Sequence, residues 1–540
     1  MGEIVGITWN SVAGGITWDG PARSLHRRAV VGALALATAA GVAALPHADA
    51  AVTPLPDLSS AEQVVGAQQA WQAGATGAGV DVAVVDTGVT PVPGLDGPQK
   101  VIYGPDLSFD SQNPNTAFAD GYGHGTAMAS IIAGNDGTAG GYQGVAPNSR
   151  ILSVKVGATN GATDVSQIIA GIDWVVQHAH DNGMNVRVLN LSLGTSSTQY
   201  YQNDPLATAA ENAWKHGIVV VASTGNENTG NAVADPATDP YVLAVAAEDP
   251  VGTVASSDDT IPTWSNRGTG SRQPDVVAPG SYIYSLNVPN STLATTYPNA
   301  VFGRYLRGSG TSQAAAFVSG AAADVISAHP GYTPDQVKAA LTSTATRISV
   351  QNPNRVGNGL VNIPAALNAN VSNAVQSFPN ATGAGSLEQA RGNSHIQLNG
   401  VTLTGEQDIM GRPWVGAAMG AAEAAGATWS GGMYNGATWS GATWSGATWS
   451  GATWSSTPLA GATWSGATWS GATWSGATWS GATWSGATWS GATWSGATWS
   501  GATWSGATWS GATWSGATWS GATWSGATWS GATWSGAEFA

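Results

Sequence analysis

The chain has 540 residues, of which only 9% are charged, and its 32 acidic and 17 basic residues give a net charge of −15. This acidic balance, without basic clusters, argues against nucleic acid as a partner. The absence of cysteine excludes disulfides, thiol catalysis and Cys-ligated metal sites.

Residues 1–50 predict an N-terminal extension that ends in a signal peptide. Arg27 and Arg28 precede the apolar stretch 29–45, and Ala48-Asp49-Ala50 fits a small-x-small cleavage site. The apolar stretch is short for a membrane span, which favours export over a membrane anchor. We therefore expect a secreted protein, with association with the cell envelope as a further hypothesis.

Residues 51–370 predict one large α/β domain, and residues 51–78 carry few signals of secondary structure. Apolar runs and helical periodicity then alternate along the chain. We expect strands at 80–85, 151–156, 186–193, 218–223 and 241–246, and helices at 165–178, 206–216, 312–329 and 333–344. This alternation predicts a doubly wound, mostly parallel sheet with helices on both faces.

Three chemically reactive side chains fall where elements of this sheet begin or end. Asp86 follows the first apolar strand, His124 stands between two glycines at the start of a small-residue helix, and Ser312 follows a Gly-rich turn and opens an apolar helix. Taken singly, each has a structural explanation as a turn, packing or capping residue. Taken together, they match acyl transfer, in which the hydroxyl attacks, the imidazole moves the proton and the carboxylate orients the imidazole.

The segments around these residues resemble the three catalytic motifs of the subtilisin-like serine peptidases. They read Val-Ala-Val-Val-Asp86-Thr-Gly-Val, Gly-His124-Gly-Thr-Ala-Met-Ala-Ser and Gly-Thr-Ser312-Gln-Ala-Ala-Ala-Phe-Val-Ser-Gly. The resemblance implies a secreted serine endopeptidase that hydrolyses polypeptides through an acyl-enzyme on Ser312. It implies no cofactor for the chemistry.

Three further segments are similar to the family's binding elements. The stretch Ala222–Asn226 is similar to the one that bears the oxyanion asparagine, which implies that Asn226 and the Ser312 backbone N–H stabilise the oxyanion. The stretch 190–194 is similar to the wall of the primary specificity pocket, and 156–163 to the edge strand that pairs with substrate. The implied substrate-binding residues are Gly161, Ala162, Thr163, Ser192, Leu193 and Gly194.

The sequence departs from the family's pattern at several points. Gln313 and Ala316 stand where the family usually has Met and Pro, so we expect altered specificity or rate and a more regular first helical turn. Only 35 residues separate Ala51 from Asp86, so we expect no folded pro-domain there. The resemblance leaves open whether the chain binds a structural calcium ion. No ligands are identified for it, because the spacing of Asp106, Asp110 and Asp120 fits no calcium loop.

The C-terminal part differs in composition from the domain before it. Residues 371–425 are expected to form a linker and a small β-containing segment. In residues 426–540 the pentad Gly-Ala-Thr-Trp-Ser occurs 20 times and supplies 20 of the 27 tryptophans. Read as Ala-Thr-Trp-Ser-Gly, the pentad resembles the pentapeptide-repeat β-solenoids, with Trp at the central position where Leu or Phe is usual. An uncharged disordered tail is the alternative.

The Trp-rich tail also predicts partners, because large aromatic faces adhere to apolar and sugar-ring surfaces. We expect association with the cell envelope or with other copies of the chain. The alternative to an active peptidase is a wall- or surface-associated binding protein with a vestigial peptidase domain.

Overall fold

The computed structural model describes residues 56–438, except 113–115, 139, 228–231, 351, 399–400, 431–432 and 436, and after them only short strands between residues 443 and 539. The expected signal peptide at 1–50 lies outside the described residues. Within the described part, every helix is too short or too polar to cross a lipid bilayer.

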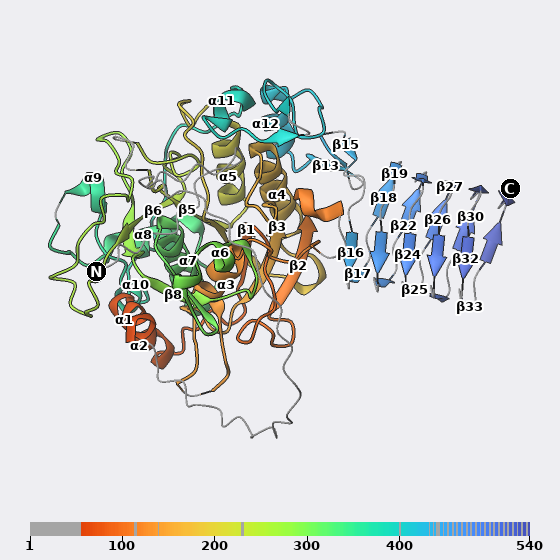
Figure 1. Cartoon of the computed structure of the whole chain (residues 1–540). Coiled ribbons are helices and arrows are strands. Elements are labelled where there is room, and N and C mark those ends of the chain that lie inside the picture. The colour runs from red at the N-terminus through yellow and green to blue at the C-terminus, as the bar shows by residue number, and fades with distance from the viewer. Residues whose placement is uncertain are drawn as a thin grey trace, which may run out of the picture.

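The domain is built on a parallel sheet of seven strands in the order β2-β3-β1-β4-β5-β6-β7 (Figure 1). The strands are β1 (Asp81–Asp86), β2 (Val101–Asp106), β3 (Arg150–Lys155), β4 (Val186–Leu191), β5 (Val219–Ser223), β6 (Leu243–Glu248) and β7 (Val276–Pro279). Because both faces are covered, the strands are almost continuously apolar instead of alternating. The predicted fold class is therefore confirmed.

Two pairs of helices cover the sheet. Helices α3 (His124–Ala133) and α7 (Thr311–Ala328) pack against each other on one face, and α4 (Val165–His178) and α5 (Pro205–Lys215) pack together on the other. Helices α4 and α5 each begin after a capping aspartate. Asp164 accepts from Ser166 N of α4, and Asp204 accepts from Leu206 N of α5. Helix α7 is buried on all sides from Thr311 to Ile326, as its apolar sequence predicts.

The remaining elements are short and surround this core. They are α1 (Pro56–Val65), α2 (Ala67–Gln72), α6 (Thr292–Thr296), α8 (Pro334–Ser343), α9 (Pro353–Val356), α10 (Ile363–Ala366), α11 (Leu387–Arg391), α12 (Gly416–Ala424), β8 (Ile283–Leu286), β9 (Val301–Phe302), β10 (Tyr305–Gly308), β11 (Gln397–Leu398), β12 (Val401–Thr402), β13 (Trp429–Ser430), β14 (Met433–Tyr434) and β15 (Ala437–Thr438). Helices α1 and α2 lie in the stretch 51–78, which was expected to be irregular. Their buried residues, such as Ala61 and Val65, pack into the main core.

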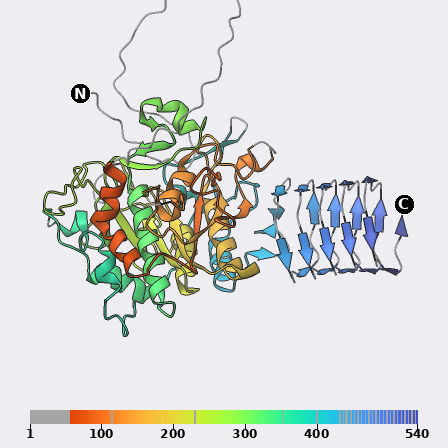
Figure 2. The same ribbon diagram turned by 90° about the horizontal axis from the view of Figure 1, so that it is seen from below.

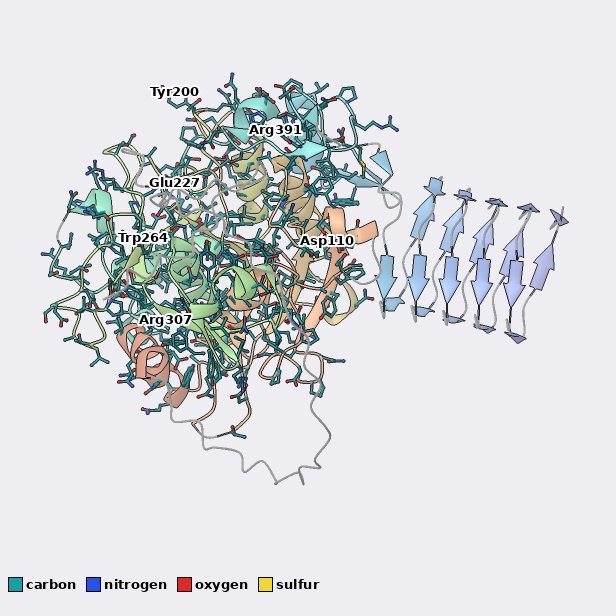
Figure 3. The ribbon with its side chains drawn as sticks, viewed as in Figure 1. Asp110, Tyr200, Glu227, Trp264, Arg307 and Arg391 are labelled. Carbon is teal, nitrogen blue, oxygen red and sulfur yellow. The ribbon has the colours of Figure 1, made fainter. Side chains whose placement is uncertain are left out.

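Residues 371–425, expected to form a linker and a small β-containing segment, contain β11 and β12 and are anchored to the domain. Arg391 of α11 is fully buried and forms an ion pair with the equally buried Asp164, with Nε 2.7 Å from Oδ2. Its Nη1 and Nη2 donate to the carbonyl oxygens of Gly405 and Gln407. Figure 3 shows Arg391 close to α11 and α12. This guanidinium therefore joins the start of α4 to the loop between β12 and α12.

After residue 438 the described elements are β16 (Thr443–Ser445) to β35 (Glu538–Phe539), each two or three residues long. Each strand from β16 to β31 pairs in parallel with the strand 20 residues later, as Trp444 does with Trp464, and together they form four five-stranded sheets. Figures 1 and 2 show the stack projecting from the side of the domain that carries β13. This is the strand pairing that a four-sided solenoid needs. The choice between a solenoid and a disordered tail stays a prediction.

Removing the buried guanidinium should destabilise the whole domain. In the Arg391→Ala variant, Asp164 is left buried without its cation, and we expect the free energy of unfolding to fall by about 3–5 kcal/mol. Chemical denaturation measures this change. The exposed Arg412 provides the control, and Arg412→Ala should change the free energy by less than about 0.5 kcal/mol. Equal effects of the two substitutions would show that the C-terminal segment is not anchored in this way.

Candidate active site

Asp86 and His124 meet at the carboxyl edge of the sheet. Asp86 is the last residue of β1 and His124 the first of α3, and they are 0% and 3% exposed. Nδ1 of His124 lies 2.9 Å from Oδ1 and 3.0 Å from Oδ2 of Asp86. Because an ionised carboxylate can only accept, this contact places the proton on Nδ1 and makes Nε2 the proton acceptor of the ring.

A second buried carboxylate, Asp120, joins the end of β1 to the start of α3. Its Oδ1 accepts from Thr87 Oγ1 and from Gly123 N, both at 2.7 Å, and its Oδ2 accepts from Thr126 N at 2.7 Å. Burial raises the pKa of Asp120, although these hydrogen bonds oppose the rise. The sequence suggested Asp120 only as a candidate calcium ligand. Its positioning role appears only in the fold, where it contacts Thr87 and Thr126.

Ser312 lies in the first turn of α7 and is 2% exposed. Its Oγ donates to the carbonyl oxygen of Ser192 at 3.0 Å, and Ser192 Oγ donates to the carbonyl oxygen of Ser312, also at 3.0 Å. This reciprocal pair fixes the first turn of α7 to the end of β4. Because β1 and β4 are neighbouring parallel strands, His124, which contacts the end of β1, and Ser312, which contacts the end of β4, lie at the same edge of the sheet.

Asn226 follows β5 and contacts the residue before Ser312. Its Oδ1 accepts from Thr311 N at 2.8 Å and from Thr311 Oγ1 at 2.9 Å. A backbone N–H can only donate, so the amide atom facing Thr311 must be the oxygen. The Nδ2 donor therefore lies on the other arm of the amide. Gly225 N in turn donates to Thr311 Oγ1 at 3.1 Å, which fixes this threonine from both sides.

The predicted pocket wall, Ser192, Leu193 and Gly194, follows directly after β4. Ser192 and Leu193 are buried, and Asn190 Nδ2 donates to Ser192 Oγ at 2.9 Å. A Cβ atom on Gly194 would lie 2.8 Å from the carbonyl oxygen of Asp235 and 3.0 Å from Cβ of Ala234. Only glycine fits this close approach between the two segments.

The predicted substrate strand at 156–163 is a turn in this structure, since β3 ends at Lys155. Gly161, with φ +82°, donates its N–H to Ala158 O, and Ala158 N donates to Ala162 O. Ala162 N donates to Asn160 Oδ1, and Thr163 is fully buried. The left-handed glycine closes this turn, which the sequence pattern did not predict. Pairing of these residues with substrate stays a prediction.

Gln313 and Ala316, which depart from the family's pattern, both lie in helix α7. Gln313 is buried, and its Oε1 has no partner among the described residues. Ala316 is buried in α7, which runs without interruption from Thr311 to Ala328.

The aspartates considered for calcium make internal hydrogen bonds. Asp106 accepts from Ser108 and Phe118, and Asp110 accepts from Thr159 and forms an ion pair with Lys155 at 3.0 Å. In the described part of the chain, three or more His, Asp or Glu side chains nowhere gather around one metal position.

Comparison with known proteins places this chain among peptidases. Residues 77–385 match the Subtilase family. Serine protease AprX of Bacillus subtilis is 37% identical over 296 residues, which cover 53% of this chain and 66% of that protein. Subtilisin Savinase of Lederbergia lenta is 37% identical over 302 residues, which cover 56% of this chain and 96% of that protein.

A solved structure with a similar fold is that of fervidolysin from Fervidobacterium pennivorans, described as a keratinolytic enzyme related to subtilisin. It has 29% sequence identity and a TM-score of 0.48, and the match covers 60% of this chain and 50% of that one.

The anchoring of Asn226 can be tested through Thr311. Thr311→Val keeps the shape but removes the hydroxyl that donates to Asn226 Oδ1 and accepts from Gly225 N. Without these hydrogen bonds Asn226 is oriented less firmly, which should cost about 1–2 kcal/mol of transition-state stabilisation. We therefore expect kcat to fall about tenfold while KM changes little. Steady-state kinetics on a chromogenic peptide measure both constants. Thr342→Val on α8, which removes a hydroxyl bonded to Lys338 O at 2.8 Å, is the control and should leave kcat unchanged. An unchanged kcat in Thr311→Val would contradict the anchoring role.

Proposed function

The chain belongs to the subtilase family of serine-type endopeptidases, and we propose that it hydrolyses peptide bonds with Asp86, His124 and Ser312 as its catalytic triad. The observation that carries this proposal is the contact between Asp86 and Nδ1 of His124 at 2.9 Å, at the sheet edge where α7 presents Ser312. Subtilases need no cofactor for this chemistry, and the three side chains supply the nucleophile, the base and its orienting carboxylate.

In the proposed mechanism, Ser312 Oγ attacks the carbonyl carbon of the scissile peptide bond. Nε2 of His124 takes the hydroxyl proton as the C–O bond forms and returns it to the leaving amine as the C–N bond breaks. Asp86 stabilises the imidazolium that exists between these two steps. Water then attacks the acyl-enzyme by the same route, with His124 again acting as base and then as acid.

The tetrahedral intermediate carries negative charge on the former carbonyl oxygen. We assign its stabilisation to Nδ2 of Asn226 and to the backbone N–H of Ser312. Two features support this assignment. Thr311 holds the oxygen arm of the Asn226 amide, and the first N–H groups of α7 lack partners within the helix. In subtilisin, loss of one such donor lowers turnover about 10²–10³-fold.

Substrate binding follows from the same edge of the sheet. Ser192, Leu193 and Gly194 form one wall of the proposed primary pocket, and Gly161, Ala162 and Thr163 lie on the proposed path of the substrate backbone. The substrates are polypeptides, and the predicted signal peptide supports action outside the cell. The runner-up hypothesis, a binding protein with a vestigial peptidase domain, is disfavoured by the intact contacts around Asp86 and Asn226.

The Ser312→Ala variant should abolish hydrolysis of casein and covalent labelling by a fluorophosphonate probe, because no other hydroxyl occupies the nucleophile position. Circular dichroism should show an unchanged fold. The wild-type chain, treated in parallel, should label with one probe per molecule. Labelling of the variant at the wild-type rate would exclude Ser312 as the nucleophile, and an unlabelled wild-type chain would favour the vestigial domain.

We further propose that the tail holds the enzyme at the cell envelope or joins copies of it. The basis is the tail's composition, which is uncharged and rich in Trp. The first residues after 426 are in contact with the domain: Trp429 Nε1 donates to Ala170 O, and Tyr434 OH donates to the buried Asp173. These contacts fix β13 and β14 to α4, so a clean deletion must start after them.

Deleting residues 439–540 should therefore leave kcat and KM on a small peptide unchanged and release more enzyme from cell-envelope fractions. Activity assays on both fractions measure this partition. A truncated enzyme that partitions as the full chain does would contradict the anchoring role. Trp fluorescence of the isolated tail separates the two structural alternatives. A blue-shifted, quencher-protected emission indicates a solenoid, and a water-exposed emission indicates disorder.

A further inference from the structure

Two buried carboxyl groups near the end of β6 lack any hydrogen-bond partner among the described residues. They belong to Glu248, the last residue of β6, and to Asp259, which lies in the loop that follows. Both residues are 0% exposed, and all four of their carboxyl oxygens are buried without a partner. Leaving a buried polar group unsatisfied costs about 1–3 kcal/mol, so a native fold seldom contains four such atoms in one place.

The backbone brings these two side chains together. Asp249 and Thr260 form an antiparallel bridge, with Asp249 N donating to Thr260 O at 2.8 Å and Thr260 N to Asp249 O at 3.1 Å. The residue before each of them, Glu248 and Asp259, therefore points to the opposite face of this bridge. Such diagonal neighbours have Cα atoms about 7–8 Å apart, which lets two carboxylates converge on one ion.

The surroundings of the pair are acidic. Burial, with Asp259 and Asp249 beside it, raises the pKa of Glu248 well above its usual value. Burial, with Asp258 and Asp249 nearby, raises the pKa of Asp259 to about 6. Among the described residues, neither carboxyl forms an ion pair with Lys, Arg or His. In the described part of the chain no cation favours the charged forms of these two carboxyls, as a bound metal ion would.

We propose that Glu248 and Asp259 bind a divalent cation, and that this cation is Ca²⁺. Two bidentate carboxylates supply four oxygens and two negative charges, and backbone carbonyls and water supply the remaining two to four ligands of a six- to eight-coordinate ion. Mg²⁺ fits less well, because it keeps most of its water and demands octahedral geometry. The oxygen-only donor set excludes a preference for softer metals.

Asp324 of α7 shows what distinguishes this pair from a lone buried acid. Both of its oxygens are also buried without a partner, and burial alone raises its pKa well above the usual value. Among the described residues no second carboxyl contributes to this shift, so protonation is sufficient to neutralise Asp324. Asp324 is therefore a matched control for the effect of removing a buried carboxyl.

The proposed ion lies behind the nucleophile turn. The carbonyl oxygen of Glu248 accepts from Gly280 N at 2.9 Å, and the carbonyl oxygen of Gly280 accepts from Gly310 N at 2.8 Å. Gly310 is the N-cap of α7, two residues before Ser312. A Cβ atom on Gly280 would lie 2.4 Å from Cβ of Ala247, so this connection is tightly packed. An ion that holds Glu248 therefore steadies the catalytic edge from behind without touching the substrate.

The test uses the full chain with Ser312→Ala, which prevents self-digestion. The protein is stripped with EGTA, and its melting temperature is measured by calorimetry with and without CaCl₂. A site filled 100-fold above its Kd stabilises the folded chain by about 2.7 kcal/mol, which for a domain of this size should raise the Tm by roughly 3–4 °C. Glu248→Gln and Asp259→Asn should each lose most of this rise, and Asp324→Asn should keep all of it. Native mass spectrometry should find one Ca²⁺ fewer per chain in the first two variants.

Two results would overturn the proposal. One is an equal Ca²⁺-dependent rise and equal Ca²⁺ stoichiometry in Glu248→Gln, Asp259→Asn and the parent chain, which would place any calcium elsewhere. The other is a stripped parent chain that binds no Ca²⁺ and shows no shift in Tm. If Glu248→Gln fails to fold, Asp259→Asn alone is sufficient for the test, because Asp259 lies in a loop and not in the sheet. Replacing CaCl₂ by MgCl₂ should give a smaller rise.

Discussion

The chemistry of this chain depends on where the buried helix α7 begins. Three strands of the sheet fix that point through the segments that follow them. The segment after β4 bonds to Ser312 through Ser192, the one after β5 bonds to Thr311 through Asn226, and the one after β7 bonds to Gly310 through Gly280. A helix that is apolar on all sides is stable only in the interior of the domain. The packing that forms the fold therefore also fixes the position of Ser312.

The few cations of the chain act as internal cross-links more than as surface charges. Lys155 is 1% exposed, and its Nζ donates to the carbonyl oxygens of Thr87 and Ala119 and pairs with Asp110. Lys338 binds the carbonyl oxygens of Pro240 and Val242 at 2.6 and 2.8 Å. Carbonyl oxygens and carboxylates beside the sheet edge are thereby satisfied. The acidic pair at Glu248 and Asp259 stands apart, because no such cross-link reaches it.

Much of the domain could be predicted from the sequence, because its signals are local. The helix at 165–178 was predicted at its observed bounds from its apolar periodicity, and the structure adds a capping aspartate, Asp164, at its start. Strand β2 was missed because Gly104 and Pro105 interrupt its apolar pattern, and β7 because it has only four residues. The turn at 158–162 was missed because one glycine with positive φ redirects a chain that otherwise reads as a strand.

The proposed active site could be predicted only in part, and the reason differs from that for the strands and turns that were missed. Residues that act directly fall in recognisable segments, whereas residues that position them are joined only by the fold. Asp120 shows this, because its contact with Thr87 spans 33 positions of sequence. Thr311 shows it as well, because its importance appears only when Asn226, 85 positions earlier, lies against it. Pairs of this kind have no signature in a single sequence.

The position of the C-terminal segment bears on how the proposed adhesive tail and the peptidase domain share one chain. Strands β13 and β14 dock on α4 through Trp429 and Tyr434, and α4 covers the sheet face opposite to α3 and α7. The repeat strands leave the domain from that side (Figure 2). The helices that present His124 and Ser312 therefore face away from the point of attachment. In the proposed function, a tail held to a surface at this position leaves the proposed catalytic edge accessible to polypeptide substrates, so binding and hydrolysis need not compete.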